Sequence, residues 1–172
     1  MKIPIYILAA VISLDGKIAR YKNQPSNWSS PEDKKHLKKI LKKCDVIIVG
    51  NNTYKISNKP LSKRNCIVLS RKIKDIKIKN KKCVYINPQK YNIKKYIKNK
   101  KYKNICILGG VQVYDWALKN KMVDEVYLTI EPAIFGRGIN FIENGLKKPI
   151  KFKLDNIKKL NLSGSLLLKL NF

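Results

Sequence analysis

The chain has 172 residues, a length that suits one domain with its own hydrophobic core, so we expect residues 1–172 to form a single domain. The formal net charge of +27 favours anionic small molecules as ligands. It does not predict specific nucleic-acid binding, because the lysines are scattered among asparagine and isoleucine rather than gathered on one face. The single histidine, His36, and 4 cysteines without a C-x-x-C pair argue against a metal site and against a Ser-His-Asp triad.

The N-terminal segment is an apolar run from Ile3 to Leu14. It is too short to span a bilayer, and Asp15-Gly16-Lys17 follows it without the small residues of a signal cleavage site. We therefore interpret residues 5–12 as a buried first strand and expect a cytoplasmic protein with no membrane contact.

The first helix begins after Ser30, which is a typical N-cap residue and is followed by Pro31 and two acids. Leu37, Ile40 and Leu41 give this helix an apolar stripe. A second buried strand covers residues 45–49, and residues 51–54 form a short helix after Gly50.

The middle of the chain alternates strands and helices. We expect a strand at residues 66–70, an exposed lysine-rich connection at 72–82, a strand at 83–86 and a helix at 91–97.

The segment from Cys106 to Asp115 predicts a strand, a Gly109-Gly110 turn and a helix, because Val111, Tyr114 and Leu118 recur at helical spacing. Glycines lack a Cβ atom, and the first N–H groups of a helix are unpaired. This turn is therefore a candidate binding site for a diphosphate.

The C-terminal part predicts a strand at residues 125–130, a loop at 135–138, and a hairpin of strands 151–160 and 166–170 joined near Ser163-Gly164. Strands and helices alternate until two strands adjoin at the end. The fold class is therefore α/β, with a mostly parallel central sheet, antiparallel C-terminal edge strands and flanking helices.

Six segments in this order resemble the dihydrofolate reductase superfamily, which includes the dihydrofolate reductases and the reductase domain of riboflavin biosynthesis. The segments are Ile7–Ala10 with Asp15–Ala19, Trp28–Asp33, Val49–Tyr54, Ile67–Arg71, Leu108–Tyr114 and Asp124–Thr129. The resemblance covers nearly the whole chain and implies a single-domain reductase with that fold.

The resemblance implies NADPH as the cofactor. The positions that match its binding site are Ala10, Ile18, Gly50, Asn51, Asn52, Thr53, Leu69, Ser70, Arg71, Gly109, Gly110, Val111, Gln112, Val113 and Tyr114. Arg71 stands where the family binds the adenosine 2′-phosphate, and a guanidinium can donate two hydrogen bonds to a phosphate. Asn51 replaces an arginine that is common in the family, which weakens the prediction of NADPH over NADH.

Asp33 follows Trp28 by five residues, as the acid of dihydrofolate reductases follows its tryptophan. The resemblance assigns these two residues to catalysis and Thr129 to the support of Asp33. A carboxylate can accept two parallel hydrogen bonds from the N–H and amino group of a pterin. Without the resemblance, an acid at this position would simply favour the helix N-terminus.

The resemblance also implies a set of substrate contacts. They are Leu8, Ala9, Lys34, Leu37, Leu61, Lys63, Arg64, Leu108 and Thr129. Lys34 departs from the apolar residue that dihydrofolate reductases place there, and a lysine could bind a phosphate.

Two substrates therefore stay open. The favoured activity is reduction of 7,8-dihydrofolate to tetrahydrofolate in one-carbon metabolism. The alternative is a riboflavin-pathway reductase acting on 5-amino-6-(5-phosphoribosylamino)uracil. The protein could be a monomer or a homodimer. We interpret residues 15–27 as a lid, and His36 as a surface residue of the first helix.

Overall fold

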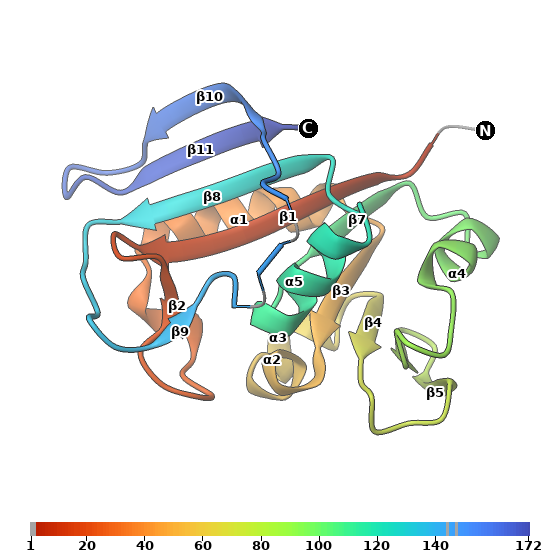
Figure 1. Ribbon diagram of the computed structural model, residues 1–172. Helices are drawn as coiled ribbons and strands as arrows, with labels where there is room; N and C mark the ends of the chain where they lie inside the picture. The colour runs from red at the N-terminus through yellow and green to blue at the C-terminus, as the bar shows by residue number, and fades with distance from the viewer. Residues whose placement is uncertain (1–2, 144, 147) are drawn as a thin grey trace.

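The computed structural model describes residues 3–143, 145–146 and 148–172. A nine-stranded sheet has the order β10-β11-β8-β1-β7-β3-β4-β6-β5, and a two-stranded sheet pairs β2 with β9 (Figure 1). The strands are β1 (Ile5–Ser13), β2 (Lys17–Ala19), β3 (Val46–Gly50), β4 (Cys66–Leu69), β5 (Ile76–Asn80), β6 (Cys83–Ile86), β7 (Asn104–Ile107), β8 (Glu125–Glu131), β9 (Ile139–Asn140), β10 (Lys153–Lys159) and β11 (Leu166–Asn171). The helices are a short 3-10 helix (Ser26–Trp28), α1 (Pro31–Lys43), α2 (Asn51–Ile56), α3 (Asn58–Leu61), α4 (Ile93–Asn99) and α5 (Val111–Lys119).

The central strands β8, β1, β7, β3, β4 and β6 are parallel. β11 pairs antiparallel with β8, and β10 pairs antiparallel with β11, so the expected fold class is confirmed. The opposite edge was predicted wrongly in part, since the expected exposed connection at 72–82 contains β5, which pairs antiparallel with β6. The alternation of isoleucine and lysine from Ile76 to Lys79 was the strand signal that the interpretation as a connection missed. Edge strands commonly carry such exposed lysines.

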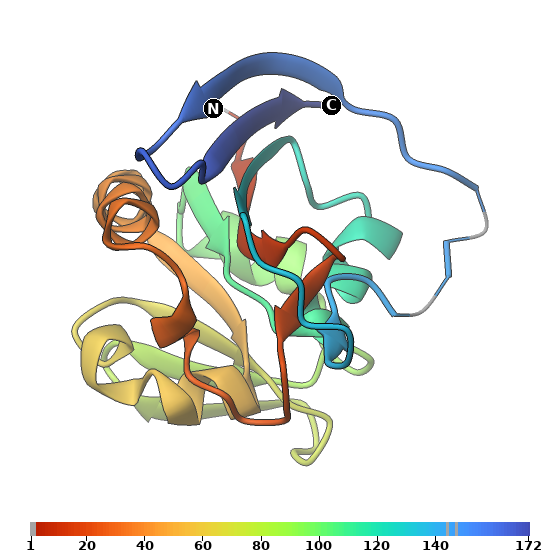
Figure 2. The same ribbon diagram turned by 90° about the vertical axis from the view of Figure 1, so that its left-hand side faces the viewer.

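Helices cover both faces of the sheet, and Figure 2 shows α1 and α5 on opposite sides. On one face, residues of α1, α2 and α3 pack on the sheet around Ile47, Val68 and Cys106. On the other face, residues of α4 and α5 pack around Leu8, Ile48 and Ile107. The parallel strands are apolar on both faces because both faces are covered.

The segment expected to form a lid is joined to a second loop. β2 pairs with β9, and the Asp15 carboxylate accepts hydrogen bonds from the backbone N–H groups of Phe135 (3.0 Å) and Gly136 (2.9 Å). A hydrogen bond from the Ser13 hydroxyl, followed by these two backbone bonds, lowers the pKa of Asp15. No helix within the described residues is long and apolar enough to cross a membrane.

Candidate active site

A cleft of about 1930 Å³ opens at the carboxyl ends of β3, β4 and β7. Residues of α1, α3 and α5 form its walls. In parallel α/β sheets, ligands bind at this edge because the loops and helix N-termini there are free to meet them.

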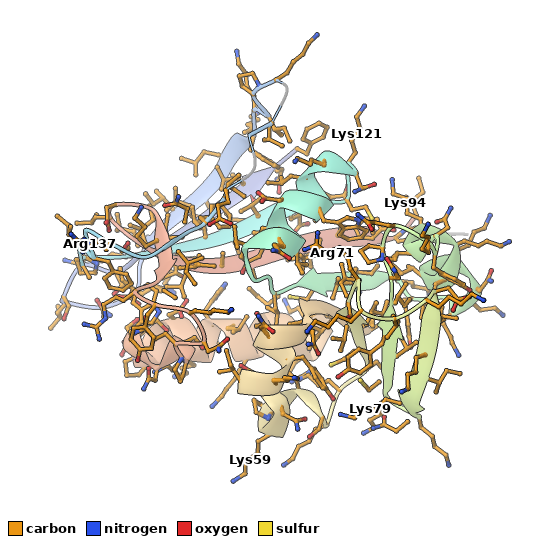
Figure 3. All side chains as sticks on the ribbon, turned by 60° about the horizontal axis from the view of Figure 1, so that its bottom comes forward. Lys59, Arg71, Lys79, Lys94, Lys121 and Arg137 are labelled. Carbon is orange, nitrogen blue, oxygen red and sulfur yellow. The ribbon has the colours of Figure 1, made fainter. Side chains whose placement is uncertain are left out.

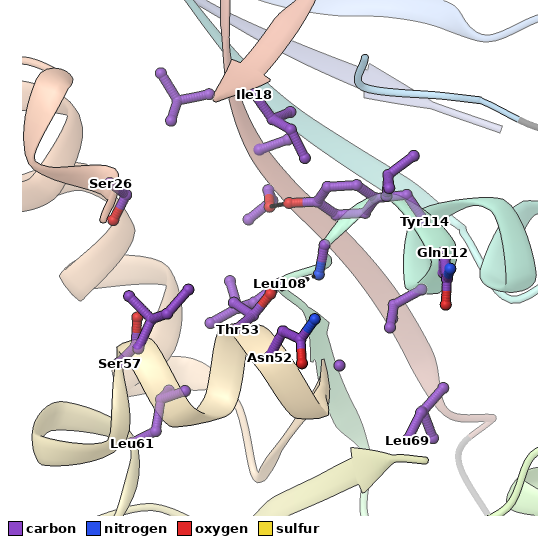
Figure 4. Close-up of a pocket in the computed structure, with 18 of the residues that line it drawn as sticks. Ile18, Ser26, Asn52, Thr53, Ser57, Leu61, Leu69, Leu108, Gln112 and Tyr114 are labelled. Carbon is purple, nitrogen blue, oxygen red and sulfur yellow. Dashed lines mark hydrogen bonds between the residues drawn. The ribbon is translucent and has the colours of Figure 1, made fainter. Parts of the chain in front are cut away.

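The floor of the cleft is the turn after β7. The Gly50 N–H donates to the Gly109 carbonyl at 2.7 Å, and the Gly110 N–H donates to the Thr53 hydroxyl oxygen at 2.9 Å. Figure 4 shows Thr53 and Asn52 of α2 on one side of this floor, with Tyr114 and Gln112 of α5 on the other. The end of β3 and the end of β7 are thus held together.

Gly109 has a φ of +78°, and a Cβ atom there would lie 2.5 Å from the Tyr114 ring. The Tyr114 hydroxyl donates to the Ala9 carbonyl at 2.9 Å, and burial raises the pKa of this phenol. Gly110 is the N-cap of α5 and offers no side-chain acceptor to the helix. The Val113 N–H already donates to the Gly110 carbonyl at 2.8 Å, so the N–H groups of Val111 and Gln112 are the ones that could meet an anion such as a diphosphate.

Asp33 lies in the first turn of α1, where the Ser30 side chain accepts a hydrogen bond from its backbone N–H. Its side chain lines the cleft but is only 7% exposed. Burial raises the pKa of the carboxyl group, while hydrogen bonds from Thr129 and Ser29 oppose that change. The charge of the buried Glu131 raises this pKa further. A carboxyl group accepts hydrogen bonds when charged and can also donate one when protonated, so the raised pKa makes Asp33 a candidate for hydrogen-bond or proton chemistry in the cleft.

Arg71 lies at the rim after β4, where its guanidinium donates to the Gln112 side chain at 3.2 Å. Ser70 and Arg71 line the cleft together with Gln112. Figure 3 shows Arg71 toward the middle of the molecule, whereas Lys79, Lys94 and Lys121 extend from its periphery.

The mouth of the cleft is basic on two sides. Lys34, Lys38 and Lys42 follow one another at four-residue spacing on α1, and Lys59 and Lys63 belong to the α3 region. The Lys34 ammonium donates to the Asn27 carbonyl at 3.2 Å. Among the residues that the structure describes, the one ion pair found joins Lys169 to Asp155, far from these lysines in the sequence. The mouth thus presents positive charge that no described acid neutralises through an ion pair.

Residues 4–163 match the family model of the RibD C-terminal domain. The chain belongs to the RibD C-terminal domain family. It is 25% identical over 167 residues to an uncharacterized protein, YwjB, of Bacillus subtilis (strain 168), over 92% of this chain and 89% of that protein.

Solved structures share the fold. A diaminohydroxyphosphoribosylaminopyrimidine deaminase/5-amino-6-(5-phosphoribosylamino)uracil reductase of Thermotoga maritima superposes with a TM-score of 0.74 at 19% identity, over 98% of this chain and 56% of that one. A dihydrofolate reductase of Enterococcus faecalis complexed with NADP(H) has a TM-score of 0.66 at 18% identity, over 97% of this chain and 95% of that one. These structures show the fold, and the match to the RibD C-terminal domain family confirms the expected superfamily.

Most of the site residues expected from the sequence line the cleft of this RibD-family domain. Those that do are Ala9, Ala10, Ile18, Asp33, Lys34, Leu37, Gly50, Asn51, Asn52, Thr53, Leu61, Lys63, Arg64, Leu69, Ser70, Arg71, Leu108, Gly110, Val111, Gln112, Val113, Tyr114 and Thr129. Their individual roles stay predictions.

Three expected positions do not line the cleft. The Leu8 side chain is fully buried among the residues packed under α4 and α5, because neighbouring residues of β1 point to opposite faces of the sheet. Gly109 acts through its backbone beneath Tyr114. Trp28 lies outside the cleft, where its indole N–H donates to the Ile18 carbonyl at 3.2 Å and its ring meets Phe135 edge-on. Its geometry is that of a residue which anchors the loop before α1.

Arg64 is partly engaged, since its guanidinium donates to the Leu41 carbonyl near the end of α1 at 2.6 Å. His36 was expected at the surface, but its ring lines the cleft and lies 5.6 Å from the Tyr127 ring. Burial lowers the pKa of His36, and its buried Nε2 has no hydrogen-bond partner among the described residues. The sequence did carry a signal for this position, because residues three apart in a helix, such as Asp33 and His36, lie on the same face. Lys38, Lys42 and Lys59 also line the cleft and were not among the expected site residues.

Proposed function

We propose that this protein is an NADPH-dependent reductase that acts on 5-amino-6-(5-phosphoribosylamino)uracil or a close phosphorylated analogue. The observation that carries the proposal is the pairing of a buried acid, Asp33, with a basic mouth in one cleft. Membership of the RibD C-terminal domain family supports this substrate over dihydrofolate, which the sequence alone favoured.

The cofactor half of the cleft fits a dinucleotide phosphate. Gly110 and the uncapped start of α5 suit the diphosphate, and Ser70 with Arg71 suits a 2′-phosphate. NADPH supplies a hydride when it is bound. Ala10 and Ile18 line the part of the cleft between β1 and the β2–β9 ribbon, where apolar side chains would exclude water from a nicotinamide ring.

The substrate half of the cleft suits a planar ring joined to an anionic arm. Asp33 can accept hydrogen bonds from adjacent ring N–H groups, and Thr129 and Ser29 hold its carboxyl group in place. Lys34, Lys38 and Lys63 can neutralise a phosphate at the mouth. Together these groups would orient the ring against the cofactor. Holding two reactants in the correct orientation removes a large part of the activation barrier of such a reaction.

Dihydrofolate is the second candidate. Two features favour this substrate: Thr129 hydrogen-bonds to Asp33, and Trp28 stands five residues before that acid. A folate presents carboxylates rather than a phosphate, so the two substrates differ in their demand on the basic mouth.

The test is NADPH oxidation by the purified protein with each compound in turn. We expect turnover of the phosphoribosylaminopyrimidine, and a KM that rises about tenfold in Lys34→Ala, the loss of roughly one charge-assisted hydrogen bond. Lys35→Ala is the matched control, because Lys35 is an exposed neighbour on α1 that does not line the cleft. Asp33→Asn should lower kcat at least about a hundredfold while NADPH still binds.

Turnover of dihydrofolate alone would assign the second candidate. If neither compound raised the rate of NADPH oxidation above the rate without substrate, both candidate functions would be overturned. Equal KM changes in the Lys34 and Lys35 variants would reject the phosphate role of the mouth.

A further inference from the structure

We propose that Glu131 is a positioning residue for Asp33, which it holds in place through Ser30 at the start of α1. The inference rests on the proposed reductase function, because it adds a residue to the machinery of the same cleft. It also gives a part in that machinery to the turn between β10 and β11, which holds the other side of the Glu131 carboxylate.

The Glu131 carboxylate lies at the end of β8 and joins two distant segments. One oxygen accepts a hydrogen bond from the Ser30 N–H at 2.8 Å, and the other accepts one from the hydroxyl of Ser165, just before β11. Ser30 is the N-cap of α1, and its hydroxyl oxygen accepts a hydrogen bond from the Asp33 N–H at 3.3 Å. A chain of two hydrogen bonds through Ser30 thus connects Glu131 to the backbone of Asp33.

The turn between β10 and β11 lies beside α1 and fixes the second oxygen of Glu131 (Figure 2). The Asn161 side-chain amide donates to the Ser165 hydroxyl oxygen at 2.9 Å, and the Ser165 N–H donates to the Asn161 side-chain oxygen at 3.1 Å. The Asn161 amide also donates to the Glu32 carboxylate, in the first turn of α1, at 3.2 Å. The turn of the helix that carries Asp33 is therefore held at two points.

Glu131 is a buried acid that is held by neutral donors. It is only 6% exposed, and no lysine or arginine in the described part of the chain forms an ion pair with it. Burial is the main cause of the raised pKa of Asp33, and the charge of Glu131 raises that pKa further. Two buried acids near each other lower stability. A glutamine could accept the Ser30 hydrogen bond without that loss, so the charge at this position is explained by its effect on Asp33.

Other titratable groups also face Asp33. From α1, the charge of His36 lowers the pKa of Asp33, in opposition to burial. From α5, burial raises the pKa of Tyr114, and the charge of Asp33 adds to that change. Glu131 on β8 is the neighbouring acid whose charge favours protonated Asp33. Removal of the Glu131 charge should therefore lower the pKa of Asp33.

The experiment compares Glu131→Gln with Glu125→Gln. Both glutamates lie on β8, six residues apart, so their side chains point to the same face of the sheet, but Glu125 is at the opposite end of the strand and does not line the cleft. The titration of Asp33 is followed by NMR in protein with isotope-labelled aspartate, and the Asp33 signal is identified by its loss in Asp33→Asn. We expect Asp33 to titrate at a lower pH in Glu131→Gln and at an unchanged pH in Glu125→Gln. The titration uses the protein without cofactor or substrate.

Kinetics provide the second readout, with NADPH and the phosphoribosylaminopyrimidine as substrates. The pH dependence of kcat that follows Asp33 should move to lower pH in Glu131→Gln. Glu131→Ala also removes the acceptor of the Ser30 N–H, and it should lower kcat at least about tenfold while the KM for NADPH stays within about twofold. A purely structural role would lower the midpoint of urea unfolding but leave kcat and the Asp33 titration of the folded variants unchanged.

An Asp33 titration that is the same in Glu131→Gln and in the unaltered protein would overturn the proposal, and so would an unchanged kcat in a folded Glu131→Ala variant. If the unaltered protein turns over neither candidate substrate, the proposed function fails, and the titration alone decides whether Glu131 acts on Asp33. If neither Glu131 variant folds, the unaltered protein decides, because acids that interact titrate in two steps. A single step for Asp33 would then overturn the proposal.

Discussion

Gly109 lies in the cleft floor at a point that leaves no room for a side chain, so Gly109→Ala is expected to destabilise the protein. The residue has a φ of +78°, and a methyl group there would lie 2.5 Å from two carbons of the Tyr114 ring. The left-handed backbone costs alanine about 1–2 kcal/mol relative to glycine. Crowding of a buried ring that is fixed by its bond to Ala9 adds about 1–3 kcal/mol.

Gly16→Ala separates these two costs. Gly16 has a φ of +75°, and a methyl group there would meet nothing within 4 Å. The Gly16 variant should therefore lose only the backbone part, about 1–2 kcal/mol, whereas the Gly109 variant should lose about 2–5 kcal/mol.

Urea unfolding followed by circular dichroism measures both losses. With a slope of about 2 kcal/mol per molar urea, the two midpoints should differ by roughly 0.5–1.5 M. In a Tyr114→Leu background, which removes the ring, the cost of Gly109→Ala should fall toward that of Gly16→Ala. Equal midpoints for the two glycine variants, or an unchanged cost without the ring, would refute the steric explanation.

Three further predictions address the site. Burial raises the pKa of Asp33 in the folded state, so the charged form of Asp33 lowers the stability of the protein. This loss of stability is absent below the unfolded pKa of about 3.9, and it grows as the pH rises through the folded pKa. Asp33→Asn should therefore gain stability relative to the unaltered protein between pH 4 and pH 7 in urea titrations, and a difference that stays constant with pH would contradict this. Tyr114→Phe removes the buried bond to Ala9 and should cost about 1–3 kcal/mol, against almost nothing for Tyr21→Phe at an exposed site, as thermal unfolding would measure. Arg71→Ala should weaken NADPH binding about tenfold and leave NADH binding nearly unchanged in fluorescence titrations, and an equal loss for both nucleotides would reject the 2′-phosphate contact.

The sequence by itself determined the features that depend on local chemistry. Ser30 and Pro31 mark the start of α1, because one caps the helix and the other suits its first turn. The apolar runs of β1, β3 and β7 predicted buried parallel strands, and the glycine pair predicted the turn before α5. The order of these motifs indicated the superfamily and placed Asp33 in a cleft.

Only the tertiary structure decided which way the side chains face and which edges pair. β5 lies in a segment of lysines and isoleucines, and it becomes a strand because β6 offers it an unpaired backbone edge. Leu8 turns into the core while Ala9 lines the cleft, and Trp28 meets Phe135 from a distant loop instead of the cleft. His36 lines the cleft from α1, where its ring lies 5.6 Å from the ring of Tyr127 on β8. These outcomes depend on contacts between residues far apart in the chain, and a local pattern carries no information about such contacts.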